Sequence, residues 1–91
     1  MKHHEFPPLP LPTDTWERIA QILELPPQQK RIVELMLRDM CGKQIAAEMK
    51  VKIPTLRTYI SRIYERTGVA NEKALLLLIC GMSHGLRHPE R

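Results

Sequence analysis

The chain has 91 residues, of which 43% are hydrophobic and 26% charged, and its formal net charge is +4. This length suits one small domain with a tail, so it excludes a two-domain enzyme with a cleft between its halves. Aromatic residues reach only 4% and glycines number four, which favours an all-α fold over a β-sandwich or barrel, and the basic excess indicates an anionic partner.

The first predicted elements are an extended arm and a helix. Residues 1–12 form the arm, because the prolines from Pro7 onward fix φ and remove backbone donors. We expect this arm to pack against its own domain. Thr13 or Asp14 can cap a helix over residues 13–25, whose apolar residues recur at helical spacing from Trp16 onward. This helix is an addition at the N-terminal side of the domain that follows.

A four-helix domain is expected over residues 26–82. Its first helix spans residues 27–40, because proline is tolerated in a first helical turn and Pro27 can therefore begin it. A short helix over residues 43–49 comes next. A three-residue turn follows, in which Val51 is the one apolar side chain between two lysines.

The last two helices of this domain also have clear signals. A basic helix over residues 53–67 ends at Gly68, which supplies the left-handed stop that helix C-termini commonly use. Asn71 is a good N-cap for a helix over residues 72–81. Residues 83–91 are mostly polar, and we expect them to form a flexible tail.

The basic residues concentrate in the middle of the chain. Residues 1–24 carry a net charge of −2, residues 25–70 carry +5, and residues 71–91 carry +1. Residues 50–67 alone hold five basic side chains and one acidic side chain. Such a density usually marks a solvated face, but it also suits binding to a polyanion.

The helix over residues 43–49, the turn and the helix over residues 53–67 have the spacing of a helix-turn-helix. Ala46 or Ala47 lets the two helices cross closely, and Val51 fills the corner under the turn. Hydroxyl and guanidinium groups on the outer face of the second helix can donate to phosphates and reach base edges in a major groove. These residues are Thr55, Arg57, Thr58, Ser61, Arg62, Tyr64 and Arg66.

Four stretches in tandem order carry a family resemblance. They read LPPQQKRIVEL, KQIAAEM, TLRTYISRIYERTGV and NEKAL. Together they resemble the LuxR-type (GerE-like) DNA-binding domain over residues 25–82 without a gap. The resemblance implies a sequence-specific regulator of transcription that places the helix over residues 53–67 in the major groove of double-stranded DNA.

The resemblance also implies roles for individual residues. The implied base contacts are Arg57, Thr58 and Ser61. The implied phosphate contacts are Lys43, Gln44, Lys52, Thr55, Tyr59, Arg62 and Arg66. Two departures from the family pattern are Pro26 and Lys52, which stand where it has capping residues, and each lost cap costs about 1 kcal/mol.

A homodimer is expected through the helix over residues 72–81. Residues 75–80 are apolar and would surround most of a helix, so one side can pack on the domain and the other needs a partner. The expected dimer contacts are Ala74, Leu75, Leu78 and Met82. Such a dimer would place two recognition helices about one DNA turn apart.

Two other interpretations stay open. The scaffold can be a protein-interaction module that binds RNA polymerase or another regulator, which the acidic, tryptophan-bearing helix over residues 13–25 favours. The promoter-reading region of sigma factors also begins with the Leu25-Pro-Pro pattern and has the short helix over residues 43–49. The Gly68-Val69 stop and the helix after Asn71 favour the LuxR type.

Catalysis and metal binding have little support in the sequence. It has no Ser-His-Asp set, paired carboxylates or glycine-rich phosphate loop, so we expect neither an enzyme, nor a cofactor, nor a small-molecule ligand. Cys41 and Cys80 are expected to be reduced thiols, and the histidines at 3, 4, 84 and 88 lack a fixed ligand spacing. Without a signal peptide or membrane span, we expect a stand-alone cytoplasmic protein with no room for a sensor domain.

Overall fold

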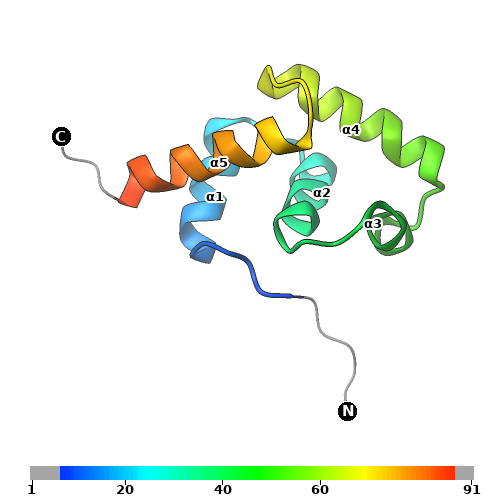
Figure 1. Cartoon of the computed structure of the whole chain (residues 1–91), viewed down its shortest axis with the longest axis horizontal. Helices are drawn as coiled ribbons and strands as arrows, with labels where there is room; N and C mark the ends of the chain where they lie inside the picture. The colour runs from blue at the N-terminus through cyan, green and yellow to red at the C-terminus, as the bar shows by residue number, and fades with distance from the viewer. Residues whose placement is uncertain (1–6, 88–91) are drawn as a thin grey trace, which may run out of the picture.

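The computed structural model describes residues 7–87, and this part of the chain folds into five α-helices without a β-strand. The helices are α1 (Thr13–Ile22), α2 (Pro27–Leu37), α3 (Gly42–Met49), α4 (Ile53–Thr67) and α5 (Glu72–Arg87). Figure 1 shows α2 near the centre, with α1 and α5 crossing on one side and α3 and α4 on the other. The predicted all-α class is confirmed. None of the described helices is long and apolar enough to cross a membrane.

α1 and α2 each end about three residues earlier than predicted. In both cases a residue without the freedom of glycine takes a left-handed conformation: Glu24 at φ 55° and Asp39 at φ 62°. The Leu25 amide then donates to Ala20 O at 3.0 Å, and the Met40 amide donates to Leu35 O at 3.2 Å. A hydrogen bond from an amide to the carbonyl oxygen five residues earlier closes each helix at its C-terminus. The left-handed residue of this motif is normally glycine, so no glycine signal marks these two helix ends in the sequence.

α5 runs to Arg87, six residues beyond its predicted end. The prediction of a flexible tail is wrong for residues 83–87, and residues 88–91 lie outside the described part. Glycine costs a helix about 1 kcal/mol relative to alanine, so Gly81 and Gly85 weaken this segment. Met82 and Leu86, one turn apart, pack against the core on the same side, which offsets that cost.

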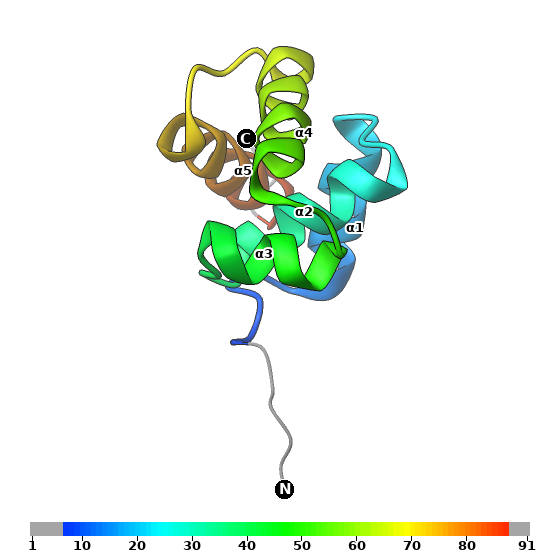
Figure 2. The same cartoon turned by 90° about the vertical axis from the view of Figure 1, so that its right-hand side faces the viewer.

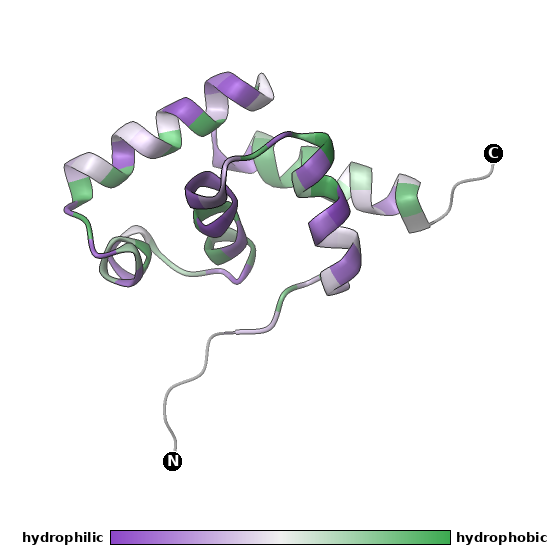
Figure 3. Cartoon of the chain, turned by 180° about the vertical axis from the view of Figure 1, so that it is seen from behind, coloured by the Kyte–Doolittle hydropathy of each residue, from purple (hydrophilic) through white to green (hydrophobic). Residues whose placement is uncertain are grey.

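One hydrophobic core joins all five helices. α1 lies against α5, and α2 contacts both α3 and α4. In Figure 3 the first part of α5 is predominantly hydrophobic, whereas α4 alternates between hydrophilic and hydrophobic residues, as expected for a helix with one solvated face. The largest fully buried side chains are Trp16, Ile19, Ile32, Val33, Leu35, Leu56, Ile63, Leu75 and Ile79.

The described part of the proline-rich arm, residues 7–12, packs on the domain as predicted. Leu9 and Leu11 are partly buried against the core. The Arg38 guanidinium donates to Pro7 O at 2.9 Å, which fastens the arm to the end of α2. The arm therefore forms part of the folded unit from Pro7 onward.

Candidate nucleic-acid interface

α3, the turn at residues 50–52 and α4 form a helix-turn-helix, which Figure 2 shows with α3 lying across the lower end of α4. Lys50 closes α3 in a left-handed conformation at φ 60°, and the Val51 amide donates to Ala46 O at 3.0 Å. Ala46 is buried, and Val51 is partly buried against the core. The small residue at the crossing and the apolar residue in the turn have the roles that the sequence predicts.

The three predicted base-contacting residues lie exposed on α4. Arg57, Thr58 and Ser61 point away from the core, into which Leu56 and Ile63 of the same helix are buried. The Thr58 hydroxyl donates to Pro54 O at 3.3 Å within the helix, which leaves its oxygen available as an acceptor. The core contacts fix the rotation of α4, so its polar face is held toward solvent.

Four of the predicted phosphate contacts are free of partners inside the protein, within the described part of the chain. They are all exposed, and none forms an ion pair or hydrogen bond through its side chain among residues 7–87. A positive charge without an internal carboxylate partner, or a hydroxyl without an internal hydrogen bond, stays available to an external anion. These four residues are Lys43, Lys52, Thr55 and Arg62.

Gln44 has a structural role that the sequence analysis did not assign. Its side-chain oxygen accepts a hydrogen bond from the Cys41 amide at 2.9 Å, and the Cys41 side chain completes a capping box at the start of α3. Glutamine at the third helical position is the usual signal for this motif. The capping box was not evident from the sequence, because serine or threonine normally occupies the position that Cys41 has here.

Two other predicted phosphate contacts are engaged inside the protein. Arg66 donates to Glu24 O at 3.0 Å and thereby ties the end of α4 to the turn between α1 and α2. Tyr59 is partly buried and packs against the core. Both roles depend on residues that are distant in the sequence, so no local pattern indicates them.

The predicted N-cap losses are confirmed. Neither Pro26 before α2 nor Lys52 before α4 makes a side-chain capping hydrogen bond. Both helices instead have proline in the first turn, which presets the backbone and lacks the amide donor that a cap would satisfy.

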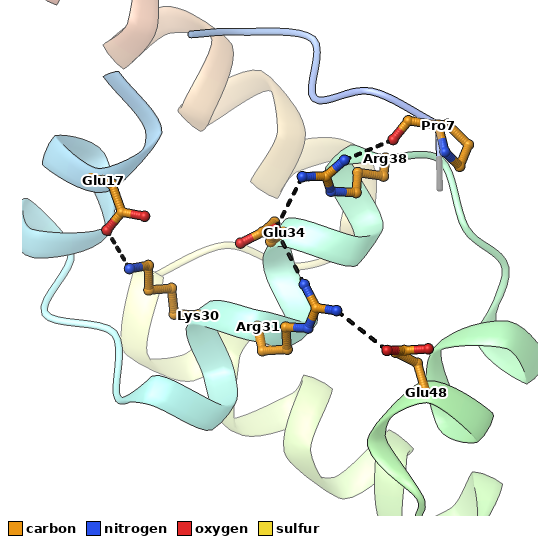
Figure 4. Close-up of polar contacts among 7 residues, drawn as sticks. All are labelled: Pro7, Glu17, Lys30, Arg31, Glu34, Arg38 and Glu48. Atoms are coloured by element: carbon orange, nitrogen blue, oxygen red, sulfur yellow. Dashed lines mark hydrogen bonds and ion pairs between the residues drawn. The ribbon is translucent and has the colours of Figure 1, made fainter. Parts of the chain in front are cut away.

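Ion pairs connect α3 to the rest of the domain through α2 (Figure 4). Arg31 bonds to Glu34 at 3.2 Å within α2 and reaches Glu48 on α3 at 3.3 Å. Arg38 also bonds to Glu34 at 3.2 Å. Partly exposed pairs of this kind contribute little stability, about 0 to 1 kcal/mol each, so their main effect is to orient α3 against α2.

The predicted dimer contacts on α5 are partly misplaced. Leu75 is fully buried, so its side chain lies inside the domain, whereas Met82 is partly buried and packs against the core. Ala74 and Leu78 are partly buried. The strongly exposed apolar side chain of this helix is Leu77, at 63%. An apolar run around a helix does not reveal which side faces inward.

Tyr64 lies on the side of α4 near the start of α5. Burial raises the pKa of its hydroxyl, and the Glu72 carboxylate raises this pKa further. The phenol therefore stays neutral at neutral pH, so it adds no negative charge to a helix that would approach phosphates.

The cysteines and histidines form no metal site in the described part of the chain. Cys41 and Cys80 are exposed free thiols, as predicted. No cluster of three metal-ligating side chains occurs among the described residues. The histidines at 3, 4 and 88 lie outside them.

The segment that contains the helix-turn-helix matches a known protein family. The sequence model of the family described as Sigma-70, region 4 matches residues 19–66, which run from α1 to the last turn of α4. This range is more than half of the chain. The chain belongs to the Sigma-70 region 4 family. This family is a helix-turn-helix DNA-binding type, so the predicted motif is confirmed, whereas the narrower LuxR type is not confirmed by the match.

Two curated proteins resemble this Sigma-70 region 4 domain. The response regulator Rre1 of Synechocystis sp. is 27% identical over 64 residues, which cover 70% of this chain and 27% of that protein. The probable HTH-type transcriptional regulator GfsR of Streptomyces halstedii is 33% identical over 63 residues, which cover 69% and 26%. The chain spans about a quarter of the length of these relatives. No solved structure matches it. The family and these relatives support DNA-binding transcription regulation.

Proposed function

We propose that this domain binds double-stranded DNA sequence-specifically with α4 in the major groove and thereby regulates transcription. The observation that carries the proposal is the exposed face of α4, where Arg57, Thr58 and Ser61 lie opposite the buried Leu56 and Ile63. The major groove of B-DNA admits one α-helix, and arginine can bind guanine O6 and N7 with two parallel hydrogen bonds. The hydroxyls beside it can donate to or accept from either kind of base pair.

Phosphate contacts on both sides of this face would orient the helix. Lys43 lies at the start of α3, Lys52 and Thr55 at the start of α4, and Arg62 further along α4. Contacts to phosphates fix the register of a protein on the duplex but carry no sequence information. We assign Gln44, Tyr59 and Arg66 a smaller share of this binding, because each already has a role within the fold.

We further propose that the domain is of the LuxR type and forms a homodimer through α5. This helix lies outside the matched range 19–66, and a shallow hollow on it is lined by Glu72, Lys73, Leu76, Leu77 and Cys80. The exposed Leu77 would be covered in a dimer, and two-fold symmetry would place two copies of α4 about one DNA turn apart. In this dimer Leu77 takes the place of the contact expected at Leu75, which is fully buried, and Ala74, Leu78 and Met82 remain expected contacts.

Two arginine variants separate base recognition from phosphate binding. Arg57→Ala should weaken binding to the preferred duplex by about 1 to 3 kcal/mol and leave binding to a scrambled duplex nearly unchanged. Arg62→Ala should weaken both by similar factors, because a phosphate contact is independent of sequence. Band-shift titrations of each variant on both duplexes measure this. Arg18→Ala, an exposed arginine on α1, is the matched control and should bind like the unmodified chain.

An equal loss of affinity for both duplexes in Arg57→Ala would show that this residue does not read bases.

A second candidate function is a protein-interaction module that contacts RNA polymerase or another regulator. Ile22, which is 52% exposed on α1, favours it. Absence of binding to any duplex would favour this second function.

A further inference from the structure

A cavity of about 470 Å³ lies where the end of α2, the middle of α5 and the proline-rich arm meet. Its volume falls within the range of about 300 to 1,000 Å³ that is typical of small-molecule sites. Most of its wall is apolar: Leu11, Met36, Leu37, Leu76 and Ile79. The cavity can therefore accept an apolar body, and its few polar groups decide which polar end a ligand would carry.

Ser83 is the polar residue that makes this cavity unusual. It lines the cavity and is only 7% exposed, and it is the one buried polar residue in the described part of the chain. No hydrogen bond joins its hydroxyl to another residue from 7 to 87, and its oxygen is not among the fully enclosed polar atoms, so it can be reached from the cavity. A hydroxyl on an otherwise apolar cavity wall, without a partner inside the protein, is suited to bind the polar end of a ligand.

Asp39 adds a negative charge to the same wall. Asp39 is exposed, so it lies at the rim of the cavity, and its carboxylate forms no ion pair within residues 7–87. The other titratable groups that line the cavity are Cys80 and His84, and the His84 side chain has a partner of its own. A carboxylate and a hydroxyl that line the same cavity favour a ligand with a positively charged, hydrogen-bond-donating end.

We propose that this cavity binds a small amphipathic amine, with its apolar body among the leucines and its ammonium group at Asp39 and Ser83. This site goes beyond DNA binding and does not depend on it, because none of its lining residues belongs to α3 or α4. No small-molecule ligand was evident from the sequence. The cavity wall comes from three separate segments, and Ser83 lies in a part that was predicted to be a tail.

Three naphthyl compounds that differ only in their polar end test the proposal on the full chain. They are 2-(1-naphthyl)ethylamine, 2-(1-naphthyl)ethanol and 1-naphthylacetate, whose fluorescence reports binding. We expect saturable binding with one site, in the order amine, alcohol, carboxylate. Ser83→Ala should weaken the amine and the alcohol alike, by about 5- to 10-fold, because both lose one hydrogen bond.

Asp39→Asn should remove the preference for the amine over the alcohol. Asparagine tolerates the left-handed conformation at this position, so the fold should be kept. Arg18→Ala, an exposed residue on α1 outside the cavity wall, is the control and should leave all three affinities unchanged. Equal affinity for the three compounds, no saturable binding, or an unchanged amine preference in Asp39→Asn would overturn the proposal. None of these outcomes depends on whether the chain binds DNA.

Discussion

Trp16→Ala is expected to lower the free energy of unfolding by about 3 to 5 kcal/mol. Trp16 is fully buried on α1, which lies against α5, and its removal would leave a cavity in the centre of the core. Small domains are stable by only about 5 to 15 kcal/mol, so this variant should be close to unfolding at room temperature. Urea titration followed by circular dichroism at the helix signal measures the change.

Trp16→Phe is the matched control for this variant. The indole N–H is buried and has no hydrogen-bond partner among the described residues, and an unpaired buried donor costs about 1 to 3 kcal/mol. Phenylalanine keeps much of the apolar contact and removes this donor, so it should cost clearly less than alanine. If Trp16→Ala unfolds at nearly the same urea concentration as the unmodified chain, α1 is an appendage and not part of the core.

Affinity for duplex DNA is expected to fall about 100- to 200-fold when the salt concentration rises from about 0.1 M to about 0.3 M. We expect about five phosphates to be neutralised, which gives a slope of log K against log salt of roughly −4 to −5. The exposed cations Lys43, Lys52 and Arg62 have no internal ion pair among residues 7–87 and supply most of this charge. Fluorescence anisotropy of a labelled duplex at several salt concentrations measures the slope.

Lys52→Ala should make this slope shallower by about one, because one phosphate contact is lost. Arg18→Ala on α1 should not change it. An affinity that stays constant across the salt range would contradict the proposed interface, since phosphate contacts necessarily release counterions.

The helix-turn-helix could be predicted from the sequence almost to the residue. Val51 in the turn and Gly68 at the end of α4 are local signals whose structural meaning does not depend on distant residues. The ends of α1 and α2 could not be predicted as well. Glu24 and Asp39 adopt left-handed conformations that usually require glycine, so the residue types at these positions do not indicate that the helices end there.

The candidate site was predictable where it depends on one helix face. The alternation of buried Leu56 and Ile63 with exposed Arg57 and Ser61 follows directly from helical spacing. The role of Arg66 was not predictable, because Glu24 O lies 42 positions away in the sequence. The same limit applies to Leu75, since its apolar neighbours do not show which side of α5 meets α1.

Selection of bound sequences from a random duplex pool tests the central claim most directly, because every possible binding site competes in the same pool. We predict an enriched motif with two related half-sites whose centres are about 10 base pairs apart, and a weaker motif when Arg57→Ala is used. A pool that stays random after several rounds, with the unmodified chain folded and present in excess, would contradict sequence-specific DNA binding by α4.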